Sequence, residues 1–285
     1  MRKLFVCIAL GLTTLTGNAA SPLWMRDVQI SPDGTEIAFC YKGDIYKVSA
    51  GGGTAIQLTT QPSYECTPIW SPDSKQIAFA SDRNGNFDIF VMPATGGTAQ
   101  RLTTHSSSEL PSAFTPDGKY ILFSASIQDP SQSALFPTTA MTELYKVPVN
   151  GGRTEQVLGT PAEAVCYAPS GEFFLYQDRK GFEDEWRKHH TSSITRDIWL
   201  YDTKTGKHTN LTNHAGEDRN PVLSPDGKSV YLLSERKGSF NVYSFPLDNA
   251  QDLKAVTSFK THPVRFLSMS HGGTLCYAYD GEIYT

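Results

Sequence analysis

The residue types that could do chemistry gather in one segment, residues 183–190. Histidine can ligate a metal or transfer a proton near neutral pH, and neighbouring carboxylates could assist either role. Side chains adjacent in sequence rarely ligate one ion together, however, so the pair His189 and His190 predicts no metal site. The same segment offers acids and two anchors for a peptide or protein: Glu183, Asp184, Glu185, Trp186 and Arg187.

Motifs of local catalytic machinery are missing from the sequence. It contains no G-x-S-x-G nucleophile elbow, no H-E-x-x-H zinc helix and no G-x-x-x-x-G-K-[ST] phosphate loop. The stretch from Asp82 to Asp88 has the acidic spacing of a calcium loop, but its twelfth position is Pro93 instead of glutamate. We interpret this stretch as a hairpin, and we expect no catalytic residue, no metal and no cofactor in this chain.

An internal repeat must position these residues. The stretch ISPDGTEIAFCYKGDIYKVSAGGGTAIQLTT at 30–60 recurs as WSPDSKQIAFASDRNGNFDIFVMPATGGTAQRLTT at 70–104, and further copies open at Phe114, Tyr167, Leu223 and Met269. Each copy holds four short alternating runs separated by Pro-Asp-Gly, Asn-Gly or Gly-Gly. This pattern is typical of four antiparallel strands joined by tight turns.

Repeats of this length and content predict an all-β fold, a six-bladed β-propeller of four-stranded antiparallel blades. The blades start near 28, 66, 111, 164, 220 and 264, and the last blade is incomplete because the copy stops at Thr285. In the run at 76–81, large Ile77 and Phe79 alternate with small alanines. This alternation fits sheets that are buried on both faces and stack large residues against small ones.

Two long insertions interrupt the regular repeat, at residues 127–142 and 179–196. Both lie between the second and third strands of a blade, and such loops emerge on the same face as the connections between blades. Loops held by a rigid scaffold often carry function. The connections add further histidines and acids to this face: His105, His214, Glu217, Asp218, Arg219 and His262.

Two interpretations of this face stay open. In one, the loops bind a peptide chain or a following domain through Trp186, Arg187, His189, His190, Asp218 and Arg219. In the other, Trp186 packs the insertion onto the propeller, while Arg187 and Arg219 pair with Glu217, Asp218 or Asp184. The two roles are compatible, since a loop at the mouth of a channel must also be held in place.

The N-terminus predicts export. Residues 1–20 combine a basic start, an apolar run from Leu4 to Leu12 and small residues at Ala19 and Ala20, as in a signal peptide. We therefore expect residues 21–285 to form a soluble periplasmic or secreted propeller without a membrane span. The net charge of −4 argues against nucleic acid as a partner. Cys40, Cys66, Cys166 and Cys276 have no C-x-x-C spacing, and the sequence selects no disulfide pairing among them.

The consensus at Trp70–Val91, W-S-P-D-x-K-x-I-A-F-x-S-D-R-x-G-x-x-D-I-[YF]-V, resembles the TolB-like, WD-repeat-like propeller repeat. Two further segments, at 181–199 and 262–285, resemble the N-terminal propeller of bacterial tricorn-type serine proteases. The resemblance covers nearly all of 24–285. It implies a non-catalytic propeller that precedes a second propeller, a PDZ domain and a peptidase core, none of which lies in this chain.

Three hypotheses of function follow. The first is an accessory propeller of an exported tricorn-like peptidase, which serves as a scaffold or channel for peptides and neighbouring domains while later domains perform hydrolysis. The second is a stand-alone TolB-like propeller that binds a protein of the cell envelope. The third, a propeller that is itself a lyase or glycosidase, would need carboxylates or histidines clustered around its channel. The incomplete sixth blade favours the first, because a self-contained propeller normally completes its last blade.

Overall fold

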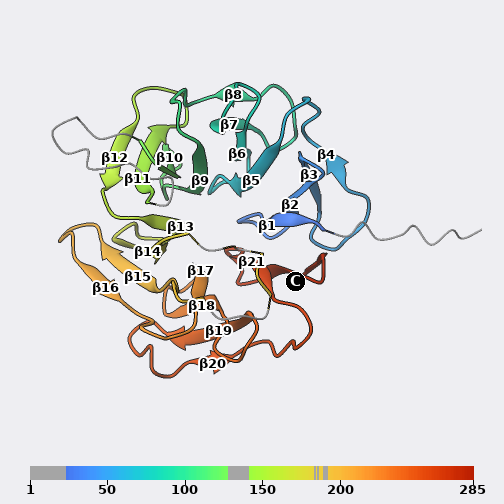
Figure 1. Cartoon of the computed structure of the whole chain (residues 1–285). Helices are drawn as coiled ribbons and strands as arrows, with labels where there is room; N and C mark the ends of the chain where they lie inside the picture. The colour runs from blue at the N-terminus through green and yellow to red at the C-terminus, as the bar shows by residue number, and fades with distance from the viewer. Residues whose placement is uncertain (1–23, 128–140, 183, 185, 189–191) are drawn as a thin grey trace, which may run out of the picture.

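The computed structural model describes residues 24–127, 141–182, 184, 186–188 and 192–285. The described residues form six antiparallel sheets arranged as blades around a central axis (Figure 1). Five sheets have four strands and the sixth has three. The expected all-β six-bladed propeller with an incomplete last blade is therefore confirmed. Residues 1–20, the expected signal peptide, lie outside the described residues, and no helix within the described ranges has the length and apolarity to cross a membrane.

The strands of each blade pair in chain order, from the axis to the rim (Figure 1). The first three blades contain β1 (Arg26–Ile30), β2 (Glu36–Tyr41), β3 (Asp44–Ser49) and β4 (Ile56–Gln57); β5 (Glu65–Trp70), β6 (Gln76–Ser81), β7 (Asp88–Pro93) and β8 (Gln100–Arg101); and β9 (Glu109–Phe114), β10 (Tyr120–Ala125), β11 (Glu143–Pro148) and β12 (Glu155–Leu158). The last three contain β13 (Ala162–Tyr167), β14 (Phe173–Asp178), β15 (Ile198–Asp202) and β16 (His208–Asn210); β17 (Asp218–Leu223), β18 (Ser229–Ser234), β19 (Asn241–Pro246) and β20 (Lys254–Ala255); and β21 (Arg265–Met269), β22 (Leu275–Tyr279) and β23 (Glu282–Tyr284).

The core lies between neighbouring blades. Phe79 of β6 is fully buried in a cluster with Ala38 of β2, and on the other side of the same sheet Ala78 is buried in a cluster with Phe123 of β10. Large residues of one blade thus meet small residues of the next. Each fully buried aromatic or aliphatic side chain contributes roughly 1.5–3 kcal/mol, so stacking of blades supplies most of the apolar stabilisation.

The Pro-Asp-Gly turns join the first and second strands of a blade. In blade one the Ser31 hydroxyl donates to Asp33 Oδ1 at 2.5 Å, and the Thr35 amide donates to the same oxygen at 3.0 Å. Gly34 adopts a φ of 77°, which a residue without a side chain tolerates best. The hydrogen bond from Ser31, followed by that from Thr35, lowers the pKa of Asp33. These turns are structural features of the repeat.

A threonine near the end of four of the repeats ties the outer strand to its neighbour. The Thr59 hydroxyl accepts a hydrogen bond from the buried Ile45 amide at 2.9 Å. The equivalent threonines of blades two, four and five accept the amides of Ile89, Ile198 and Val242 at the same distance. In these four blades a threonine hydroxyl therefore takes the place of one backbone acceptor between the third and fourth strands.

We expect the substitution Thr59→Val to lower the free energy of unfolding by about 1–3 kcal/mol, because it leaves the buried Ile45 amide without an acceptor. Urea denaturation followed by fluorescence measures this change. The matched control is Thr60→Val, since Thr60 is the exposed neighbour of the same type. Equal effects of the two substitutions would show that the hydroxyl of Thr59 is not a structural tie.

The ring closes between blades six and one. The His271 amide donates to the Pro32 carbonyl at 2.7 Å, and the Ile30 amide donates to Ser268 Oγ at 3.1 Å. On the opposite face the Met25 amide donates to the Gly281 carbonyl at 3.3 Å. These hydrogen bonds thus join blade six to blade one, although the strands of the two blades belong to separate sheets.

The connections divide the propeller into two faces. We call loop face the side that carries the loops between second and third strands together with the connections between blades. Bonds between the two kinds of loop place them side by side: the Glu65 amide donates to Gly43 O at 2.7 Å and the Asp218 amide donates to Arg196 O at 3.0 Å. The other side, with the Pro-Asp-Gly turns, is the turn face. The expectation that both kinds of loop share one face is confirmed.

Candidate functional site

A buried cluster of arginines and glutamates anchors the blade-four insertion to blade five. Arg187 of the insertion donates to Glu217, in the connection between the blades, and to Glu235, in the next loop. Arg196 Nη1 donates to Glu217 Oε1 at 2.6 Å, and Arg219 Nε donates to the same oxygen. All five side chains are buried. We call this group, residues 187, 196, 217, 219 and 235, the arginine cluster.

Glu217 is the centre of the arginine cluster. Burial by itself would raise the pKa of this carboxyl, but the hydrogen bonds and positive charges of Arg219, Arg196 and Arg187 outweigh burial and lower the pKa to about 2. The carboxylate is therefore charged at any physiological pH. Its backbone is also held, because the Glu217 amide donates to Glu235 Oε1 at 2.8 Å. The cluster fixes the base of the insertion as a rigid unit.

Trp186 extends from the arginine cluster across the axis of the propeller towards blades six and one. Its ring lies edge-on to Phe266 of β21, with ring centroids 6.0 Å apart. The guanidinium carbons of Arg26 and Arg265 lie 4.6 Å and 5.0 Å from the centre of the Trp186 ring. Arg265 Nη2 also donates to the Trp186 carbonyl at 3.1 Å. The insertion of blade four therefore rests on strands from the opposite side of the ring.

Trp186 separates two hollows on the loop face. An inner cavity of about 190 Å³ lies on the axis and is lined by Trp186, Asp27, Thr67 and Asn220. The last three sit at bulges of the innermost strands, where their φ angles are positive. An outer pocket of about 530 Å³ opens beside Trp186, towards β1 and β21. We call the outer hollow the Trp186 pocket.

The structure brings three of the sequence-predicted residues together and separates a fourth. Arg187 and Arg219 meet at Glu217, and Trp186 lies next to them, which are the contacts expected if the insertion packs onto the propeller. Asp218 is buried away from them and pairs with Arg236 at 3.1 Å. Burial raises the pKa of Asp218, although Ser234 and Arg236 act in the opposite direction. Binding of a partner by these residues stays a prediction, and His189 and His190 lie outside the described residues.

The other histidines of the loop face have local partners. Nδ1 of His105 accepts the Ser107 amide at 3.0 Å, and Nδ1 of His214 accepts the Gly216 amide at 2.8 Å. His262 Nε2 lies 3.1 Å from Asp280 Oδ1. In the part of the chain that the structure describes, no three His, Cys, Asp or Glu side chains gather as a metal-binding group. The four cysteines of the described residues are free thiols.

The candidate calcium stretch is a hairpin in the structure. Asp82 Oδ1 accepts the Tyr64 amide at 2.7 Å, and Asn86 donates to the carbonyls of His105 and Ser107. Asp88 is buried, and one of its oxygens lies 2.8 Å from the Arg101 guanidinium. These side chains bind the hairpin to neighbouring loops instead of pointing towards a common centre.

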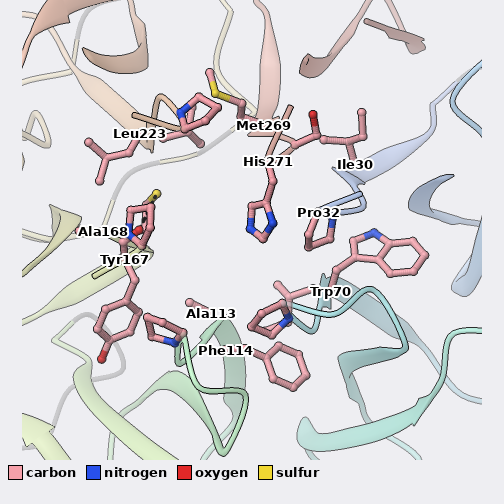
Figure 2. A pocket seen from close by; sticks show the side chains of 18 of the residues that line it. Ile30, Pro32, Trp70, Ala113, Phe114, Tyr167, Ala168, Leu223, Met269 and His271 are labelled. Atoms are coloured by element: carbon pink, nitrogen blue, oxygen red, sulfur yellow. Dashed lines mark hydrogen bonds between the residues drawn. The ribbon is translucent and has the colours of Figure 1, made fainter. Parts of the chain in front are cut away.

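The turn face contains a second mouth of the central channel, with a volume of about 440 Å³ (Figure 2). The prolines of five turns with the sequence Pro-Asp-Gly, Pro-Asp-Ser or Pro-Ser-Gly line it, and His271 takes the place of proline in blade six. Figure 2 shows the His271 side chain directed into this mouth. Sequence reasoning missed this residue. The signal was available, because MSHGG aligns with LSPDG of the preceding repeat.

Sequence reasoning also missed a buried acid at the start of blade three. Glu65 and Asp218 occupy equivalent positions in blades two and five, and each pairs with an arginine from the adjacent loop, Arg83 and Arg236. Strand register places Ile127 at the corresponding position of blade three. Glu109 therefore lacks this arginine.

The missing arginine changes the titration of Glu109. Burial raises the pKa of its carboxyl to about 7, and the charge of Asp88 acts in the same direction. A hydrogen bond with Thr103 and the charge of Arg101 oppose the rise without cancelling it. Glu109 is thus a buried acid that titrates near neutral pH.

The geometry of the loop face suits binding better than catalysis. It offers cations and tryptophans around open hollows, while the acids of the arginine cluster are buried and ion-paired. The class defined by fold and site is a six-bladed propeller with an insertion in blade four, whose described residues Trp186 and Arg187 lie at one mouth of the channel. The chain belongs to the tricorn protease N-terminal beta propeller domain family, whose model matches residues 22–285.

Known proteins similar to this chain are longer. A solved structure of the tricorn protease superposes with a TM-score of 0.76 at 22% identity, over 92% of this chain and 25% of that one. TolB from Acinetobacter baumannii gives a TM-score of 0.66 at 20% identity, over 88% of this chain and 66% of that one. The uncharacterized peptidase YuxL of Bacillus subtilis is 32% identical over 72 residues, which are 25% of this chain and 10% of the relative. The chain thus spans about a tenth of that relative and a quarter of the tricorn protease.

Proposed function

We propose that this chain is the non-catalytic propeller of an exported tricorn-like peptidase, acting as a scaffold or channel for peptide substrates and neighbouring domains. The observation that carries the proposal is the match of 264 consecutive positions, residues 22–285, to the N-terminal propeller family of that protease. Hydrolysis would then belong to domains outside this chain. Residues 1–20, as a signal peptide, would direct the protein to the periplasm or the exterior.

The loop face supports a role as a docking surface or channel mouth. The arginine cluster holds the insertion rigidly, so that Trp186 stands between the inner cavity and the Trp186 pocket. Binding residues on loops are most effective when a rigid scaffold positions them. A tryptophan flanked by two guanidinium groups is also a residue environment that is enriched at protein interfaces.

Peptide hydrolysis tests this division of labour. The purified 285-residue chain should release no fluorophore from unstructured fluorogenic peptides, whereas the native polypeptide that carries this sequence should cleave them and lose activity to a serine-directed organophosphate. Cleavage by the 285-residue chain itself would contradict the proposal. A native polypeptide that cleaves nothing but binds an envelope protein would instead support a TolB-like binding propeller, which has the same fold.

A further inference from the structure

The Trp186 pocket is rich in positive charge. Arg26, Lys188 and Arg265 line it, and the carboxylate of Asp280 is the acid among its described lining residues. That carboxylate already lies 3.1 Å from His262 Nε2. Arg26 and Lys188 thus place positive charge beside one engaged carboxylate in a chain whose net charge is −4. The pocket is a local positive site on an acidic protein.

The cations of the Trp186 pocket keep groups that can meet an anion. Guanidinium groups stacked on an aromatic ring interact with it through their faces, and the N–H donors in their plane stay directed outward. Arg26 stacks on Trp186 in this manner, at 4.6 Å. Within the described ranges no carboxylate lies within ion-pairing distance of Arg26 or of the exposed Lys188. A carboxylate entering the pocket would find these two cations on one side.

The rim of the pocket is apolar and aromatic. Trp24 is 70% exposed and Trp186 is 46% exposed, and both line the same pocket. Exposed tryptophans beside arginines are the side chains most often found at the energetic centre of protein interfaces. The position of Trp186 is fixed, because Phe266 packs against its ring and Arg265 donates a hydrogen bond to its carbonyl. The ligand that fits both features presents an acid and an apolar side chain close together.

We propose that the Trp186 pocket docks an acidic segment of a polypeptide. Its Asp or Glu carboxylates meet Arg26 and Lys188, while an apolar side chain lies against Trp24 and Trp186. This inference rests on the proposed docking role of the propeller and names the chemistry of the partner. The pocket volume of about 530 Å³ admits a few side chains. A long polyanion such as duplex nucleic acid is disfavoured, because the net charge of the chain, −4, repels it.

Isothermal titration calorimetry with designed peptides tests the proposal on the 285-residue chain. The probe is a twelve-residue peptide of Glu and Phe, acetylated and amidated so that its only charges are side-chain carboxylates. We expect it to bind, and we expect replacement of every Glu by Gln to weaken binding at least about tenfold, or roughly 1.4 kcal/mol. A rise in salt from about 0.05 M to 0.5 M should weaken binding as well.

Variants of the protein locate the site. The double substitution Arg26→Gln with Lys188→Gln should weaken binding of the Glu peptide about tenfold or more. The matched control is Lys119→Gln, since Lys119 is an exposed cation beside a Pro-Asp-Gly turn on the opposite face, and it should leave binding unchanged. Because none of these three side chains belongs to the buried core, unchanged circular dichroism and melting temperature are expected for every variant.

Several outcomes would overturn the inference. The first is equal binding of the Glu and Gln peptides, and the second is an equal loss of affinity in the Lys119→Gln control. The third uses a Gln peptide whose C-terminal carboxylate is left free: if this peptide alone binds, the pocket recognises a chain end. Saturable displacement of the Glu peptide by inorganic phosphate at micromolar concentration would assign the pocket to phosphate.

Failure of these titrations leaves the proposed function intact if the native polypeptide still carries a peptidase region. A native polypeptide without that region contradicts the proposed function whatever the peptides do.

Discussion

Replacing Glu217 with glutamine is expected to lower the free energy of unfolding by about 3–5 kcal/mol. The glutamine has nearly the same volume, but it leaves the buried guanidinium groups of Arg187, Arg196 and Arg219 without their shared negative charge. Removing one partner of a buried ion network is far more costly than removing a surface pair. Urea denaturation at pH 7 measures the change, and trypsin should cleave after Arg187 faster in the variant.

The pH dependence gives a second test of the same carboxylate. The pKa of Glu217 is lowered to about 2 in the folded protein, below roughly 4.3 in an unfolded chain. Its stabilising contribution is therefore present above pH about 4 and is lost as the pH falls towards 2. The difference between wild type and Glu217→Gln should shrink over that window. The control Glu172→Gln removes an exposed partner of Lys204 and should leave stability nearly unchanged. A loss below about 1 kcal/mol for Glu217→Gln would contradict the anchoring role.

The substitution Glu109→Gln is expected to stabilise the protein at pH 8 by up to about 3 kcal/mol and to have little effect at pH 4. The folded pKa of Glu109, about 7, lies above its unfolded value. The protonated side chain is therefore stabilising below pH about 4, and this contribution is lost as the pH rises through 7. Glutamine mimics the neutral acid at every pH. Urea denaturation of both proteins at pH 4, 6 and 8 measures the difference.

Two further variants test why Glu109 is perturbed. Ile127→Arg restores the arginine that blades two and five place at this position, and it should lower the pKa of Glu109 towards its ordinary value. Glu65→Gln, in contrast, removes an acid that already has its arginine and should destabilise the protein at pH 8. If the free energies of unfolding of the wild type and of Glu109→Gln differ by the same amount at every pH, Glu109 does not titrate near neutrality.

The fold could be predicted from the sequence because the repeat carries it. Pro-Asp-Gly turns, alternating runs such as Gln76–Ser81 and the final Leu-Thr pair recur often enough for six blades and the missing outer strand to be recognised. These features depend on local interactions: turn geometry, strand alternation and, in four blades, a hydrogen bond to a threonine hydroxyl. Long-range contacts then only stack blades that each repeat already specifies.

The site could be predicted only in part. The sequence indicated the loop face and Trp186, Arg187 and Arg219, because insertions into a repeat stand out. It could not indicate that Arg26 and Arg265, distant in the chain, meet Trp186 across the axis, since closure of the ring brings them together. Of the alternative acidic partners of Arg187 and Arg219, Glu217 pairs with both arginines, whereas Asp218 pairs with Arg236, because alternation along β17 turns its side chain away from that of Arg219.

The size and domain content of the native polypeptide test the central claim most directly. Intact mass spectrometry and peptide mapping of the endogenous protein that carries this sequence would supply both. The account predicts a polypeptide well above the 31.3 kDa of these 285 residues, with a peptidase region that follows the propeller. A native mass at or below 31.3 kDa, with Thr285 as the last residue, would contradict the assignment to a tricorn-like peptidase and favour a propeller that acts by itself.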